Sequence, residues 1–232
     1  MRALTLLTFV LTTSLLLAAA LPAQATDNPG YAEGQFYTRM DNPAPPPNPG
    51  KITVQEFFWY GCPHCFHLDP ILNKWIKTLP ADVVFEHVPD NLGNPLGKLH
   101  EKAFYTATAL GIEHKIHTPL FRAIHVQHQQ LRSKEALRDF FVQIAGISPD
   151  QFNNAWSSFG VDHNIRRADK LAKDYRIMAV PALVINGEYE LQGGLPGYAA
   201  MGGSEGSHFH KMLKVADALI AKLQKQQPQS TR

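Results

Sequence analysis

The spacing of apolar residues predicts strands near both ends of the chain and helices between them. β-Branched and aromatic residues occupy both parities of Lys51–Trp59, which predicts a largely buried strand. Val83–Val88 is a second strand candidate, and strand signals return only at Ala182–Ile185 and Glu188–Leu191. Because Asn186-Gly187 separates these last two segments, we expect them to form a hairpin with a two-residue turn.

Apolar residues at helical spacing fill most of the remaining chain. Pro63 suits the first turn of a helix, where its missing N–H is no loss, and this helix is expected to run to Leu79 with Pro70 inside it. Beyond the second strand the periodicity predicts helices alone, over residues 96–110, 112–126 with a break near Pro119, 133–146, 148–156 and 161–175. After a Gly-rich loop, a final amphipathic helix is expected from Phe209 to Leu223. The order of these elements indicates an α/β protein with a helical block set into it.

The first 25 residues predict an export signal. Arg2 precedes an almost uncharged apolar run that ends at Leu21, and Ala23-Gln24-Ala25 has the small-x-small pattern of a signal-peptidase site. We expect cleavage after Ala25, with a retained membrane anchor as the competing interpretation. Residues 26–50 then form a Pro-, Asn- and Gly-rich arm with one short strand candidate at Gln35–Arg39.

Composition narrows the possible functions. The chain has 232 residues, of which 44% are hydrophobic, so it can bury a large core without extra crosslinks. A formal net charge of +2 creates no strong electrostatic field, and nucleic-acid binding or broad adsorption to membranes therefore has no support. After the leader, no segment approaches the ~20 consecutive apolar residues of a membrane span.

The only two cysteines, Cys62 and Cys65, stand at the spacing Cys-x-x-Cys. A bridge across two residues closes a very short loop and so constrains little of the unfolded chain. Disulfide exchange is therefore a better explanation than a structural crosslink. We expect Cys62 at the helix N-terminus, where the helix dipole, free N–H groups and His64 favour its thiolate. Cys65, one turn further into the helix, would be the buried resolving partner.

Two residues outside the motif are further candidates. Glu56 shares strand parity with Ile52 and Val54, and a carboxyl buried there could relay protons to or from Cys65. The plainer alternative is a partly hydrated strand end with no role. Val180-Pro181 comes directly before the hairpin, and a proline at a strand start marks an edge or a turn in which a cis bond can occur.

Histidines raise the alternative of a metal or haem site. The residues that could bind zinc lie close together in the sequence: Cys62, His64, Cys65 and His67. Such short adjacent spacings close poorly around one tetrahedral ion, and no second ligand pair follows elsewhere. Haem attachment needs histidine directly after the second cysteine, where Phe66 stands. Four more histidines share helix faces in pairs and are expected on solvent-exposed helix: His114 with His117, and His125 with His128.

The whole pattern resembles the thioredoxin superfamily and, within it, the DsbA family of periplasmic thiol-disulfide oxidases. Cys62-Pro63-His64-Cys65 is identical to the active-site sequence of that family. Pro70 stands at the kink proline of the superfamily, and Val180-Pro181 stands at its cis-proline position. The resemblance covers nearly all of the chain after the leader. It implies a thioredoxin fold over residues 26–94 and 176–232, with an all-helical domain inserted at 95–175.

The resemblance also implies roles for individual residues. Cys62 would be the exposed nucleophile that forms a mixed disulfide with the substrate, and Glu56 would be the buried acid. The Val180 backbone would pair with the substrate peptide beside Pro181. One position departs from the best-known member of the family, because we place Phe85 where that protein has a lysine beside the acid.

The function implied is oxidation of reduced, unfolded exported proteins in the periplasm by a monomer. It needs no metal and no cofactor beyond the Cys62–Cys65 disulfide, which a membrane quinone-linked oxidase resembling DsbB would regenerate. Two alternatives stay open: a disulfide isomerase or reductase of the same fold, and a non-catalytic chaperone that binds peptides. Isomerases resembling DsbC carry an N-terminal dimerisation domain, which the short arm at residues 26–50 cannot supply.

Overall fold

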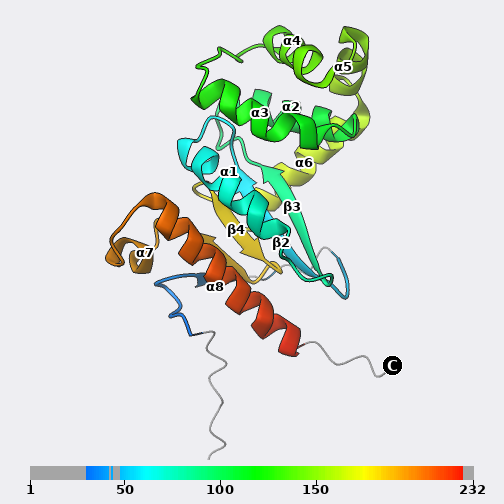
Figure 1. The fold of residues 1–232 in the computed structure, drawn as a ribbon. Helices are drawn as coiled ribbons and strands as arrows, with labels where there is room; N and C mark the ends of the chain where they lie inside the picture. Colours follow the sequence, from blue (N-terminus) through cyan, green and yellow to red (C-terminus); the bar gives the residue numbers. More distant parts are fainter. Residues whose placement is uncertain (1–29, 42, 44–47, 227–232) are drawn as a thin grey trace, which may run out of the picture.

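One mixed sheet forms the centre of the molecule. The computed structural model describes residues 30–41, 43 and 48–226, in which five strands pair in the order β1-β5-β4-β2-β3 (Figure 1). Their bounds are β1 Thr38–Arg39, β2 Ile52–Phe58, β3 Val83–Pro89, β4 Ala182–Ile185 and β5 Tyr189–Gln192. Strands β2 and β3 are parallel, whereas β4 runs antiparallel to both of its neighbours. Every residue of β2 is buried, as its apolar sequence predicts.

The predicted hairpin joins β4 to β5. Asn186 and Gly187 both have positive φ, 55° and 68°, which these two residue types adopt more readily than others. The N–H of Glu188 donates to the carbonyl of Ile185 at 2.9 Å and closes the two-residue turn. The turn therefore confirms the interpretation of Asn-Gly, and β5 begins one residue later than predicted.

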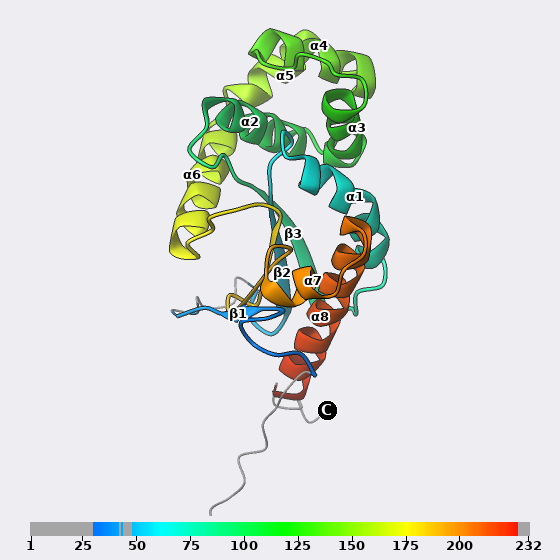
Figure 2. The ribbon, with the colours of Figure 1, turned by 90° about the vertical axis from the view of Figure 1, so that its left-hand side faces the viewer.

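Two long helices cover one face of the sheet. Helices α1 (Pro63–Ile76) and α8 (Glu205–Gln226) lie together on that face in both views (Figures 1 and 2). The core beneath them includes fully buried residues from β2, β4 and both helices: Ile52, Val54, Leu68, Leu183, Met212 and Leu219. The Gly-rich segment before α8 contains a short helix, α7 (Pro196–Ala200), which the sequence analysis treated as loop. The core therefore holds α1 firmly against the sheet.

The helical block follows β3 and precedes β4 in the chain; most of it lies beyond one end of the sheet, and its last helix runs back beside the sheet (Figure 2). It consists of α2 Pro95–Ala109, α3 Glu113–His125, α4 Lys134–Ala145, α5 Pro149–Trp156 and α6 Phe159–Asp174. Ser148 caps α5 with the reciprocal hydrogen bonds of a capping box, as predicted. A core shared by the block and the end of β2 includes Phe58, which packs against Phe104 with ring centroids 5.5 Å apart.

Helix α3 corrects one expectation. The predicted break near Pro119 is wrong, because α3 runs continuously across this residue. Proline removes one backbone hydrogen bond of a helix, and burial of Ile116 and Leu120, each 0% exposed, offsets that loss. The boundaries assigned to the inserted domain, residues 95 and 175, stay a prediction.

Two features bear on the membrane and on export. Within the described residues, no helix is both long and apolar enough to span a bilayer. The predicted leader and its cleavage after Ala25 lie outside those residues.

Candidate active site

The cysteine motif lies at the junction between β2 and α1. Cys62 is the N-cap of α1 with an extended backbone, and Pro63 occupies the first helical turn, as predicted. Cys65 is 0% exposed, as expected of a resolving thiol. Cys62 is only 8% exposed and is therefore less open than the resemblance implies, because the backbone of Val180 lies against its sulfur.

The two thiols have opposite electrostatic surroundings. The pKa of Cys62 is lowered most by a hydrogen bond from Cys65, and further by backbone N–H groups and by His64. These effects outweigh burial, which raises the pKa, and bring it to about 6. Burial raises the pKa of Cys65 well above the ordinary thiol value, and the charges of Cys62 and Glu56 raise it further. Cys62 is thus suited to leave as a thiolate, whereas Cys65 needs a proton when it leaves.

We expect the thiolate of Cys62 to form at mildly acidic pH. In reduced protein, absorbance of the thiolate near 240 nm should rise around pH 6, since the surroundings of Cys62 lower its pKa to about 6. Because this pKa lies below that of a free thiol, the thiolate stabilises the reduced fold. The stabilisation is complete above the free-thiol pKa of about 8.5 and is lost as pH falls through about 6. A Cys62→Ala variant is the blank, and absorbance that appears only above pH 8 would contradict the assignment.

Val180 and Pro181 face the motif from the opposite side. The Val180-Pro181 bond is cis, so the structure confirms the predicted isomer. The thiol of Cys62 donates to the carbonyl oxygen of Val180 at 3.4 Å. A groove of about 450 Å³ extends from this point and is lined by His64, Val180, Pro181, Glu205 and Phe209, among others. An extended peptide in this groove would lie beside Cys62.

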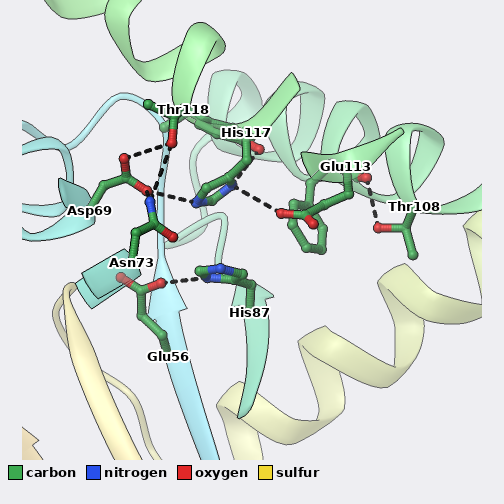
Figure 3. Close-up of polar contacts among 10 residues, drawn as sticks. Glu56, Asp69, Asn73, His87, Thr108, Glu113, His117 and Thr118 are labelled. Atoms are coloured by element: carbon green, nitrogen blue, oxygen red, sulfur yellow. Dashed lines mark hydrogen bonds and ion pairs between the residues drawn. The ribbon is translucent and has the colours of Figure 1, made fainter. Parts of the chain in front are cut away.

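Glu56 is buried beneath the helix, 2% exposed, as its strand parity predicts. The sheet register sets His87 of β3 opposite Glu56, and the Nδ1 of His87 lies 2.7 Å from the carboxylate (Figure 3). Burial alone would lower the pKa of His87, but the hydrogen bond and charge of Glu56 reverse this and raise it. Phe85 pairs with Val54 instead. The placement of Phe85 at the position of the family lysine stays a prediction, and the polar partner of the acid in this chain is the imidazole of His87.

His117 overturns another expectation. It was placed on solvent-exposed helix, yet its side chain is 5% exposed and its ring lies 4.4 Å from that of His87. Its Nδ1 lies 2.9 Å from the hydroxyl of Tyr60, and its Nε2 lies 3.3 Å from the carboxylate of Asp69 (Figure 3). The spacing from His114 suggested one exposed face, but His117 stands three and four residues before the buried Leu120 and Phe121, and that spacing favoured burial.

The other three of these histidines differ in exposure. His114 and His128 are exposed, as predicted. His125 is half-buried, because its ring stacks on Phe66 at 5.0 Å and its Nε2 lies 2.8 Å from the carbonyl oxygen of Tyr60. Its position next to the motif, which sequence spacing did not indicate, helps to hold the segment between β2 and α1.

A possible metal-ligand set lies under the site. In residues 30–41, 43 and 48–226, the group of ligand atoms close enough to share an ion belongs to His87, Glu113 and His117, within 4.8 Å of one another. The Nδ1 of His87 is already paired with Glu56, and the two ring nitrogens of His117 face Tyr60 and Asp69. The Nε2 of His87 stays open, but His117 could bind an ion only by giving up Tyr60 or Asp69, so the arrangement favours a hydrogen-bonded network.

Comparisons with known proteins agree with this chemistry. A family model described as a DSBA-like thioredoxin domain matches residues 53–211. The thiol:disulfide interchange protein DsbA of Pseudomonas aeruginosa is 36% identical over 210 residues, which cover 90% of this chain and 94% of that protein. The corresponding protein of Azotobacter vinelandii is 40% identical over 187 residues, covering 81% and 82%. The crystal structure of the P. aeruginosa protein superposes with a TM-score of 0.73 at 35% identity, covering 84% of this chain and 96% of that one.

Proposed function

The chain belongs to the DsbA family of thioredoxin-fold disulfide oxidoreductases, and from this premise we propose that it works as an oxidase, donating the Cys62–Cys65 disulfide to reduced proteins. The proposal that the protein oxidises its substrates rests on the pKa of Cys62, which its surroundings lower to about 6. A stabilised thiolate favours the reduced form of the protein, and a disulfide whose reduced form is favoured is an oxidant.

The reaction would proceed through a mixed disulfide. A substrate thiolate attacks the sulfur of Cys62, the Cys62–Cys65 bond breaks, and Cys65 leaves and takes up a proton. A second substrate thiolate then attacks the substrate sulfur of the mixed disulfide, and Cys62 leaves as a thiolate. The substrate gives up two electrons and forms its disulfide, while the protein ends as a dithiol.

The surroundings of the cysteines suit both steps. His64 stabilises the thiolate of Cys62 by its charge, and Pro63 begins the helix whose N-terminal N–H groups do the same. Val180 and Pro181 line the groove beside the nucleophile, where the backbone of Val180 could pair with the substrate peptide. Glu56 lies buried on the side of Cys65, where a proton is needed.

We further propose the setting in which this reaction occurs. The substrates would be reduced, unfolded exported proteins, and the compartment would be the periplasm, reached with the leader predicted at residues 1–25. The reduced dithiol must pass its two electrons on, and a membrane quinone-linked oxidase resembling DsbB would accept them. The protein would act as a monomer without a metal or an organic cofactor.

Reduced and scrambled ribonuclease distinguish this function from its alternatives. We expect stoichiometric amounts of the oxidised protein to restore activity to reduced ribonuclease at least about 10-fold faster than the same amount of oxidised glutathione does, since the thiolate of Cys62 is a better leaving group than that of a free thiol. An isomerase would instead rescue the scrambled form. A chaperone that only binds peptides would oxidise neither, and its effect would survive Cys62→Ala. Failure to oxidise the reduced form would contradict the proposed function.

A further inference from the structure

Glu205 joins the active-site helix to the C-terminal helix. It is the first residue of α8, and its two carboxylate oxygens contact the Nδ1 atoms of His64 and His67, the latter at 2.5 Å. These histidines lie one turn apart on α1, so a single carboxylate spans both. Glu205 also lines the groove beside Cys62. No sequence pattern links Glu205 to the motif, because it lies 141 positions from His64.

The carboxylate of Glu205 compensates for positive charge at the N-terminus of α1. A helix N-terminus carries partial positive charge, so imidazolium groups in the first turns of α1 are disfavoured there. The carboxylate offsets this, and it is itself favoured at the N-terminus of α8. Glu205 raises the pKa of His64, chiefly through their hydrogen bond. Burial alone would raise the pKa of the Glu205 carboxyl, but its bonds to the two histidines hold it below the usual value.

The charge of His64 acts in turn on the nucleophile. The titratable groups that face His64 are Cys62 and His67 on its own helix, and Glu205 and His208 across the groove on α8. A cationic His64 contributes to the lowered pKa of Cys62. His208 points its Nε2 at the carbonyl oxygen of Gly202, 3.0 Å away, so it does not take the place of Glu205. The contacts therefore run from Glu205 through His64 to Cys62.

We propose that Glu205 is a positioning residue for disulfide exchange, which holds His64 cationic and oriented beside Cys62 and thereby makes the Cys62–Cys65 disulfide a stronger oxidant. This inference rests on the proposed function for its consequence in oxidation. Its first step, the effect on the thiolate, can be measured on the reduced protein alone. The two ideas can therefore fail separately.

A Glu205→Gln variant tests the proposal by two measurements. We expect the thiolate absorbance of Cys62 to appear at higher pH, and the equilibrium with glutathione at pH 7 to shift about 2- to 5-fold toward the disulfide form. This shift converts to about 0.4–1 kcal/mol, which lies within the range of an exposed ion pair. Without the carboxylate, a smaller fraction of His64 is protonated. The thiolate of Cys62 is then less stable, and so is the reduced form of the protein. The shift should shrink as salt is added.

Three further variants separate this role from a structural one. Glu205→Asp should retain most of the effect, and His67→Ala should leave the titration of Cys62 unchanged, although His67 contacts the same carboxylate. In a His64→Ala background, Glu205→Gln should have no further effect. An equal shift in that background, or lower thermal stability with an unchanged Cys62 titration, would overturn the proposal. A shifted titration without oxidation of ribonuclease would instead contradict the proposed function.

Discussion

Replacing Cys65 by alanine is expected to stop the exchange at a mixed disulfide on Cys62. Cys65 is 0% exposed in the first turn of α1, next to Cys62, with which it shares a hydrogen bond. A resolving thiol fixed at this position attacks intramolecularly, and such reactions have very high effective concentrations. Without it, only a thiol from solution can release the substrate. We expect the adduct to persist on the order of 100-fold longer than in the unmodified protein.

A model peptide with one cysteine, supplied as its disulfide with thionitrobenzoate, makes this measurable. The Cys62 thiolate attacks the peptide sulfur and expels thionitrobenzoate, which reports adduct formation by its colour. In the unmodified protein Cys65 then attacks Cys62, so the peptide leaves as a thiol and the protein becomes oxidised. Mass spectrometry follows the remaining adduct, whose place is unambiguous because the chain has only two cysteines.

A Cys62→Ala variant is the matched control. It should form no adduct, because its remaining thiol is 0% exposed and has a pKa well above the usual value. An adduct on Cys65 in this variant would show that the roles of the two cysteines are reversed. Release of the peptide from Cys65→Ala at the rate of the unmodified protein would show that Cys65 does not resolve the intermediate.

The features predicted well from the sequence are those set by local interactions. Cys62 precedes Pro63 at a helix start, and this short signal fixes the cap and the direction of the thiol without long-range information. Asn186-Gly187 determines its turn in the same way, since few residue pairs adopt two successive positive φ angles. The apolar sequence of β2 predicts burial of both its faces, and Glu56 is buried with them.

The features that were missed depend on contacts between distant segments. The companion of Glu56 follows from the register between β2 and β3, and that register sets His87, not Phe85, opposite the carboxyl. Glu205 reaches the active site only because α8 packs beside α1. His117 became buried because α3 also packs against α1. No pattern within one segment specifies these pairings, and they decide the electrostatics of the site.

Glu56→Gln is expected to slow reduction of the Cys62–Cys65 disulfide by about 10- to 100-fold, below the usual range for general acid–base groups because water can partly replace the carboxyl. Cys65 leaves into a fully buried environment, where burial disfavours its thiolate. A proton must therefore arrive as the bond breaks. Glu56 is paired with His87, and His87 lines a pocket of about 380 Å³ that also includes Glu113, which provides a path from solvent.

The pH dependence separates this role from a change in folding. His87 has a raised pKa, because its hydrogen bond with Glu56 outweighs burial, so it keeps its proton to higher pH than a free imidazole does and loses it as pH rises further. Stopped-flow measurement of tryptophan fluorescence should give a rate that falls from pH 6 to pH 8 in the unmodified protein and depends less on pH in Glu56→Gln. Thermal unfolding should change little at pH 8, where the charge of His87 matters least and the amide oxygen can still accept from its ring, and the loss of stability should grow as pH falls.

Glu86→Gln is the matched control for this substitution. Glu86 precedes His87 on β3 and lines the same pocket, but it pairs with Arg167, so its loss removes a carboxyl from the same strand while the contact between Glu56 and His87 stays intact. Its rate should keep the pH dependence of the unmodified protein. Equal rates for Glu56→Gln and the unmodified protein across pH 6 to 8 would rule out the relay. Cys65 would then receive its proton from solvent, and the buried pair of Glu56 and His87 would serve the fold alone.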